Sequence, residues 1–197
     1  DAGDDDDDND GCLDNDDAAS FTWSHDTDED GEGADCDESP YGEIELSFSN
    51  STETSIDLLY SSDVAIGGYQ FTVNGVNLTD AYDTYDLIVF VPENGNVFGT
   101  DLNGYDLPAG EGLLLHFEFE AIDGGSIISL IDNNFAVFAN SDGVGQLNVT
   151  LPESATIQPC WNYDNDSLSN GYYEESGNGG CDLYDPDDDN DGALDDD

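Results

Sequence analysis

The sequence contains no lysine, no arginine and no methionine among its 197 residues, and its only basic side chains are two histidines. Against these stand 49 aspartates and glutamates, so the formal net charge is −49. Because nothing in the chain can pair with phosphate, nucleic acid and anionic lipid surfaces are excluded as partners. Self-repulsion on this scale opposes compaction, so we expect neutralisation from outside by divalent cations.

The sequence also has no apolar run long enough for a membrane-spanning helix or a signal peptide. We expect no membrane insertion and interpret the chain as a mature, secreted part of a longer protein, located outside the cell or at its surface. Enzyme motifs are absent as well: there is no Gly-x-Ser-x-Gly and no phosphate-binding loop, and His25 and His116 lie far apart in sequence. The sequence predicts that the protein is not an enzyme.

The acidic residues are concentrated at the two ends of the chain. Residues 1–40 hold 18 of them and residues 160–197 hold 13, whereas the much longer middle, residues 41–159, holds 18. This distribution predicts three segments: an Asp-rich calcium-binding start (1–40), a β domain (41–159), and an end (160–197) that combines a disulfide-tied piece with further Asp-rich sequence.

All four cysteines lie in the acidic ends, at Cys12, Cys36, Cys160 and Cys181. An even number in segments with little apolar material indicates disulfides formed in an oxidising compartment. Four cysteines allow three connectivities, of which proximity favours Cys12–Cys36 and Cys160–Cys181. The short Cys-x-x-Cys spacing of zinc sites is missing.

Three stretches repeat the pattern Asp-x-Asp-x-Asp-Gly and add a further acid downstream. Alternate carboxylates can converge on one hard cation, and the glycine permits the positive φ that folds the chain back over it. The sequence therefore predicts several bound Ca²⁺ ions. EF-hand-like and dockerin motifs are a competing source of such loops, but they need an amphipathic helix after the loop, and none follows here.

These stretches resemble thrombospondin type 3 repeats, in which Asp-rich loops wrap calcium ions and cysteines cross-link neighbours. The resemblance implies an extended, calcium-filled connector with almost no hydrophobic core. It also implies three ligand sets: Asp6, Asp8, Asp10 and Asp14; Asp26, Asp28, Asp30 and Asp35; and Asp187, Asp189, Asp191 and Asp195. Asp17 is a further candidate in the first set. Phe21 and Trp23 interrupt the acidic run, and we expect them to cap the adjacent β domain.

The middle segment consists almost wholly of predicted strands. Apolar and polar residues alternate with period two in most of them, and Gly, Asn and Asp cluster between them as turn signals. Residues 86–91 form a continuous apolar run that suits a strand buried on both faces. The other predicted strands are 43–49, 55–60, 69–74, 112–121, 126–131, 135–138 and 146–151. Eight or nine short strands and no long helix predict a mainly β fold, an antiparallel two-sheet sandwich of the jelly-roll or immunoglobulin-like kind.

Two runs in this segment, residues 56–73 and residues 107–119 with Leu107-Pro-Ala-Gly-Glu-Gly, resemble cohesin-type modules. Those modules are jelly-roll sandwiches that act as docking or scaffold units in extracellular assemblies. The chain also carries Asn-x-Ser/Thr patterns, which predict N-glycosylation in a host that modifies this motif. The four patterns start at Asn50, Asn77, Asn148 and Asn165.

Two functions follow from these features. The first is a calcium-stabilised structural repeat unit of an extracellular fibre, adhesin or surface assembly, joined head to tail through its Asp-rich ends to neighbouring repeats or to copies of itself. The alternative is an extracellular carbohydrate-binding or cohesin-type docking module, with a glycan or another module as partner.

Overall fold

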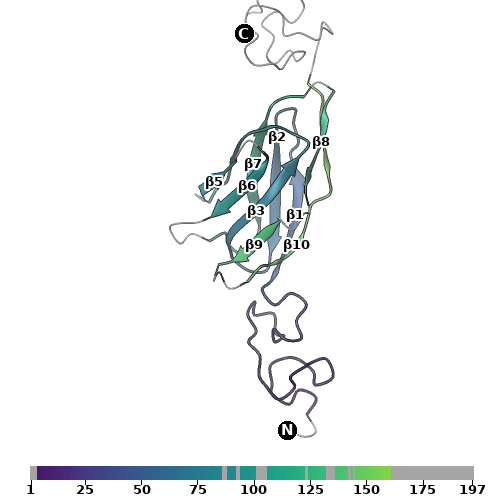
Figure 1. Ribbon diagram of the computed structural model, residues 1–197, viewed down its shortest axis with the longest axis vertical. Helices are drawn as coiled ribbons and strands as arrows, with labels where there is room; N and C mark the ends of the chain where they lie inside the picture. Colours follow the sequence, from purple (N-terminus) through teal and green to yellow (C-terminus); the bar gives the residue numbers. More distant parts are fainter. Residues whose placement is uncertain are drawn as a thin grey trace, which may run out of the picture.

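The structure, a computed structural model, describes residues 4–85, 88–91, 94–100, 106–122, 124–131, 136–141, 143 and 145–160, with only the backbone of Ile88 and Phe90. Its described residues form two β-sheets packed face to face and no helix, which confirms the predicted mainly β sandwich (Figure 1). The described part of the chain accordingly holds no helix that could cross a membrane.

Five strands form the first sheet. In spatial order they are β10 (Asn148–Thr150), β1 (Glu43–Ser49), β2 (Ser55–Ser62), β7 (Gly110–Phe119) and β4 (Leu78–Tyr82). The second sheet has the order β11 (Ala155–Ile157), β8 (Ser126–Leu130), β3 (Ile66–Asn74), β6 (Asn96–Thr100) and β5 (Ile88–Phe90). A further strand, β9 (Val137–Asn140), pairs with the first half of β3, and β8 pairs with its end.

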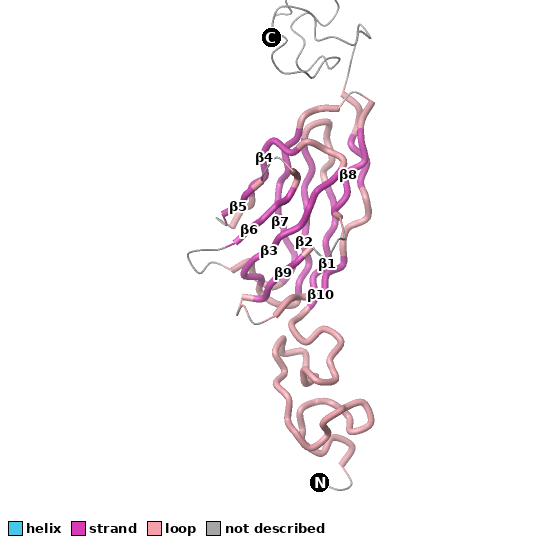
Figure 2. The backbone as a smooth tube through the Cα atoms, viewed as in Figure 1, coloured by secondary structure: helices cyan, strands magenta, loops and turns pink. Residues whose placement is uncertain are grey.

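One pair departs from the predicted antiparallel arrangement. β10 runs parallel to β1, with Glu43 opposite Asn148 and Glu45 opposite Thr150. The chain reaches β10 from β9 of the second sheet. Residues 145–147 first pair antiparallel with β9, through the Ala139–Gln146 bridge and a hydrogen bond from the Leu147 amide to the Phe138 carbonyl, and β10 then joins β1 in the first sheet (Figure 2). A crossing connection can enter an edge in either direction, which is why a pattern of strands and turns did not reveal the parallel pair.

The continuous apolar run at residues 86–91 is not a strand buried on both faces. Its described strand, β5, forms an edge of the second sheet, where it pairs only with β6, and Val89 and Val91 are partly exposed. The structure also contains β4, β6 and β11, which the alternation of residues did not predict. All three are short, at five residues or fewer.

The core lies between the two sheets and is built from every second residue of the strands, on the side that faces the other sheet. In β1 and β2 these are Ile44, Leu46, Ile56, Leu58 and Tyr60, each at most 3% exposed. An aromatic cluster joins the sheets: Phe71 of β3 lies 6.3 Å from Phe117 of β7, measured between ring centroids, and 6.1 Å from Phe138 of β9. Burial of these side chains is the main source of stability in the sandwich.

The described chain enters and leaves the sandwich at opposite poles. In Figures 1 and 2 the N-terminal loops lie at one end of the long axis, below β10, while the described chain leaves at the other end, beyond β8. The predicted Cys12–Cys36 disulfide is present in the N-terminal loops. Cys160 at the opposite pole is also disulfide-bonded, and its predicted partner Cys181 lies outside the described residues.

Candidate metal centre

Two twelve-residue loops make up most of the N-terminal segment, and they have the same conformation. Loop 1 (residues 6–17) and loop 2 (residues 26–37) align at an offset of 20 residues. The fourth residue of each has a positive φ, 61° at Asn9 and 65° at Glu29, and the sixth is a glycine with φ of 94° at Gly11 and 102° at Gly31. Glycine tolerates these values, which fold the chain back at the middle of each loop.

Equivalent hydrogen bonds hold both loops. The amide of the glycine donates to the first aspartate of its own loop, Gly11 to Asp6 at 3.2 Å and Gly31 to Asp26 at 3.0 Å. The fifth-position aspartates, Asp10 and Asp30, each accept the amide two residues later, at 3.0 and 2.9 Å. A closing turn follows, in which the amides at positions 11 and 12 donate to the carbonyl at position 8.

This fold gathers the first three predicted ligands of each loop. The carboxylates of Asp6, Asp8 and Asp10 have oxygen atoms within 4.8 Å of one another, and the same holds for Asp26, Asp28 and Asp30. The twelfth residues are Asp17 and Asp37. Asp17 was a further candidate from sequence, whereas the sequence reasoning missed Asp37, which aligning the two loops at their 20-residue offset would have found.

The fourth predicted ligands lie elsewhere in the loops. Asp14 occupies the ninth position of loop 1, where one carboxylate oxygen accepts the amide of Asp7 at 2.9 Å. Asp35 lies one residue past the equivalent position, which Ala34 occupies, and its carboxylate sits 3.6 Å from the sulfur of Cys12. Asp35 therefore belongs to the contact between the loops. The third predicted set, Asp187, Asp189, Asp191 and Asp195, lies outside the described residues.

Several carboxylate oxygens in the loops are buried without a hydrogen bond. Both oxygens of Asp8 and one each of Asp17, Asp26 and Asp28 expose less than 1 Å² and have no hydrogen-bond partner among the described residues. A buried anionic oxygen without a partner is unfavourable, and proteins pair such groups with donors or with metal ions. The arrangement thus fits a cation surrounded by carboxylates.

Burial and neighbouring carboxylates raise the pKa of the third residue of each loop, Asp8 and Asp28. Burial raises the pKa of Asp8, and the charges of Asp10 and Asp17 raise it further. Burial likewise raises the pKa of Asp28, with added repulsion from Asp30 and Asp37. The repelling groups come from loop positions 3, 5 and 12, so these carboxylates share one small space in each loop. A divalent cation there would turn repulsion into attraction.

The donor chemistry discriminates between metals. The clustered atoms are carboxylate oxygens, which suit hard cations such as Ca²⁺ or Mg²⁺. Asp10, Cys12 and Asp35 form another close group, but Cys12 is tied in the disulfide and offers no thiolate to a soft metal.

Phe21 and Trp23 do not cap the sandwich, as the sequence had led us to expect. Their side chains are 80% and 59% exposed, and Leu13 in loop 1 is 53% exposed. The ring of Trp23 contacts His25 at a centroid distance of 5.7 Å. These two rings therefore do not pack against the core of the sandwich.

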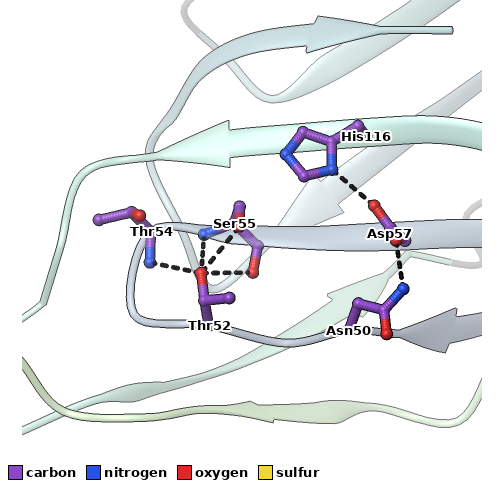
Figure 3. A network of polar contacts seen from close by, with 6 residues as sticks. All are labelled: Asn50, Thr52, Thr54, Ser55, Asp57 and His116. Carbon is purple, nitrogen blue, oxygen red and sulfur yellow. Dashed lines mark hydrogen bonds and ion pairs between the residues drawn. The ribbon is translucent and has the colours of Figure 1, made fainter.

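A separate polar network lies on the outer face of the first sheet (Figure 3). His116 of β7 contacts Asp57 of β2 through its Nδ1 atom at 2.5 Å, and Asn50 donates to the other oxygen of Asp57 at 2.6 Å. Burial raises the pKa of Asp57, but the hydrogen bonds from Asn50 and His116 outweigh burial, so the pKa lies below its ordinary value. Tyr82 of β4 lies against the His116 ring.

The outer face of the second sheet carries an apolar hollow of about 280 Å³. Gly67 and Gly68 of β3 and Gly99 of β6 form part of its lining, and Phe98, 47% exposed, stands beside them. Gly99 cannot carry a side chain, because a Cβ atom there would lie 2.1 Å from the ring of Tyr69.

Three predicted glycosylation sites lie in the described residues, all with exposed side chains. The side-chain nitrogen of Asn50 donates to Asp57, that of Asn77 donates to Glu120 at 2.7 Å, and Asn148 lies on the edge strand β10. Asn165 lies outside the described residues. Glycosylation at these positions remains a prediction.

No protein-family model matches the sequence, and no curated protein matches it. The resemblance of the acidic loops to thrombospondin type 3 repeats therefore also remains a prediction.

Similar solved structures are cohesin modules. A non-cellulosomal cohesin from the archaeon Archaeoglobus fulgidus is 12% identical, covers 58% of this chain and 89% of its own, and has a TM-score of 0.44. A type I cohesin–dockerin complex from Clostridium thermocellum gives 15% identity, coverage of 59% and 99%, and a TM-score of 0.42. A cohesin module of a Clostridium perfringens family 33 glycoside hydrolase is 10% identical, and the match covers 60% of this chain and 96% of that module with a TM-score of 0.42. At these TM-scores the likeness assigns no function to the chain.

Proposed function

We propose that this chain is a calcium-stabilised structural unit of an extracellular assembly, with loops 1 and 2 as calcium-binding connectors attached to a self-sufficient β-sandwich. The observation that carries the proposal is the set of buried carboxylate oxygens without partners in both loops, at Asp8, Asp17, Asp26 and Asp28. Calcium supplies the missing partner, and it would be held by carboxylates at positions 1, 3, 5 and 12 and by a backbone carbonyl at position 7.

The placement of the loops supports a connecting role. They extend from one pole of the sandwich, and the described chain ends at the opposite pole (Figure 1). A unit with connectors at opposite poles can join neighbours head to tail, either copies of itself or other repeats. The Cys12–Cys36 disulfide suits an oxidising environment, outside the cell or at its surface.

Metal removal tests the proposal. Hydrogen exchange of the full chain is measured in Mg²⁺, after excess EGTA, and in Ca²⁺ at about 5 mM, which exceeds the Kd of about 0.1–1 mM of extracellular calcium modules. We expect residues 4–37 to lose protection in EGTA and regain it with Ca²⁺, while the sandwich keeps its protection throughout. Equal protection of residues 4–37 in all three solutions would refute the calcium-dependent connector.

The apolar hollow beside Phe98 favours a second candidate function, a docking or carbohydrate-binding module. An exposed aromatic ring next to glycines offers a flat surface on which a sugar or an apolar side chain can stack. Wild type and Phe98→Ala are compared on immobilised extracellular polysaccharides and on candidate protein modules. Binding that Phe98→Ala abolishes supports this function, and absence of binding to either class counts against it.

A further inference from the structure

The two loops are packed against each other as one unit, and Asp10 is the residue that joins them. Asp10 is only 6% exposed although it carries a carboxylate. One of its oxygens accepts the amide of Cys12 in its own loop, at 3.0 Å. The other accepts both the amide and the hydroxyl of Ser24, at 3.0 and 2.8 Å. Ser24 lies two residues before Asp26, the first ligand of loop 2.

Glycine positions show how closely the loops approach. A Cβ atom on Gly11 of loop 1 would lie 2.0 Å from the carbonyl oxygen of Gly31 in loop 2. A Cβ atom on Gly33 would lie 2.1 Å from the hydroxyl of Ser24 and 2.9 Å from the carboxylate of Asp10. The Cys12–Cys36 disulfide ties the same surfaces covalently. The loops therefore cannot change shape independently.

Asp10 still has capacity for a cation. A carboxylate offers about four acceptor positions, and the donors from Cys12 and Ser24 occupy three of them. The equivalent residue of loop 2, Asp30, is exposed and accepts hydrogen bonds only from Glu32 among the described residues. Asp10 is thus both a ligand position of loop 1 and the anchor for the start of loop 2.

We propose that loops 1 and 2 bind calcium cooperatively, with the contact between Asp10 and Ser24 carrying the coupling. A cation in loop 1 holds the Asp10 carboxylate in the orientation that accepts Ser24. Ser24 in turn fixes the backbone that leads into Asp26, so loop 2 loses less conformational entropy when it binds its own cation. This inference rests on the proposed function, because it presupposes a calcium ion in each loop.

The amides of Gly11 and Gly31 report on the two loops separately, since each donates to the first aspartate of its own loop. Calcium titrations of the full chain, followed by ¹H–¹⁵N spectra, give a midpoint for each amide. We expect Asp8→Asn to weaken the response at Gly11 and to raise the calcium midpoint at Gly31 about 5-fold or more, the lower end of typical coupling between sites. Ser24→Ala removes the hydroxyl bond to Asp10 and keeps the amide bond, so in that background Asp8→Asn should raise the Gly31 midpoint by clearly less than it does with Ser24 in place.

Asp5→Asn is the matched control for charge. Asp5 is exposed, lies beside loop 1 and occupies no ligand position, so its loss removes one negative charge without removing a ligand. An Asp5→Asn effect at Gly31 as large as that of Asp8→Asn would overturn the coupling, as would an unchanged Gly31 midpoint in Asp8→Asn. In both cases the calcium responses of the wild-type glycines would leave the proposed function standing. Absence of any calcium response at either wild-type glycine would instead overturn the proposed function.

Discussion

Removal of the Cys12–Cys36 disulfide tests how the acidic segment is held together. The two cysteines are 24 residues apart in sequence, and closing a loop of that length lowers the entropy of the unfolded chain by an amount worth about 3.5 kcal/mol. Little else opposes unfolding of residues 4–37, because their only buried residues in the structure are Asp10, Cys12 and Gly33. Cation binding at 100 times the dissociation constant adds about 2.7 kcal/mol per site.

We therefore expect the double variant Cys12→Ser/Cys36→Ser to order its loops only at much higher calcium. If binding and local folding are fully coupled, a loss of about 3.5 kcal/mol raises the calcium midpoint by up to about 300-fold. Hydrogen exchange of residues 4–37 as a function of free Ca²⁺ gives this midpoint. Exchange in the sandwich is the internal reference and should not change.

The matched control is Cys160→Ser/Cys181→Ser, which makes the same chemical change at the opposite end of the chain and should leave the midpoint of residues 4–37 unchanged. A shift below about threefold in the Cys12→Ser/Cys36→Ser variant would correspond to less than 1 kcal/mol. Such a result would refute the reasoning, because the segment would then be held by contacts other than the disulfide and the cations.

Three further substitutions test other parts of the molecule. Phe71→Ala should lower the free energy of unfolding of the sandwich by about 3–5 kcal/mol in urea titrations, because Phe71 is 1% exposed between both sheets; an effect below 1 kcal/mol would contradict the assigned core. Glu29→Asn copies the residue at the same position of loop 1. Because Glu29 has a φ of 65°, the substitution should stabilise loop 2 by about 1 kcal/mol, measured by hydrogen exchange. No gain in stability would show that the backbone at Glu29 is not strained. Asp57→Asn should destabilise the sandwich above about pH 4, and urea titrations at several pH values should show the difference from wild type vanishing as the pH falls further. The pKa of Asp57 is lowered in the folded state, so its stabilisation is present above the unfolded pKa and is lost as pH falls through the folded one; a constant difference would contradict this.

The sandwich illustrates what alternation of residues can predict. β1, β2 and β7 followed from period-two patterns because one face of each strand is buried and the other is exposed. β4 was missed because Leu-Thr-Asp-Ala-Tyr buries only Ala81 in its short length. The pairing of β10 with β1 could not be predicted either. The sequence marks the strand but not the sheet that it joins after β9.

The loops show a different limit. Spacing alone predicted that the first, third and fifth residues of each loop come together, and the structure brings their carboxylate oxygens within 4.8 Å of one another. The later positions depend on how the chain turns after the glycine, and in loop 2 Asp37, the twelfth residue, lies close enough to Asp28 to raise its pKa. No spacing rule predicts that Asp10 reaches Ser24, since that contact depends on how two loops pack together.

The two parts of the chain therefore depend on different forces. The sandwich buries an aromatic and aliphatic core, so its stability should follow temperature and denaturant as in any small β domain. The described acidic segment, residues 4–37, has no such core, and its carboxylates repel one another. Under the proposed function a bound cation would relieve this repulsion. It follows that free calcium should change the order of the connector while leaving the sandwich intact. An assembly made of such units would stiffen or loosen at its connectors as the calcium outside the cell rises or falls, without unfolding its domains.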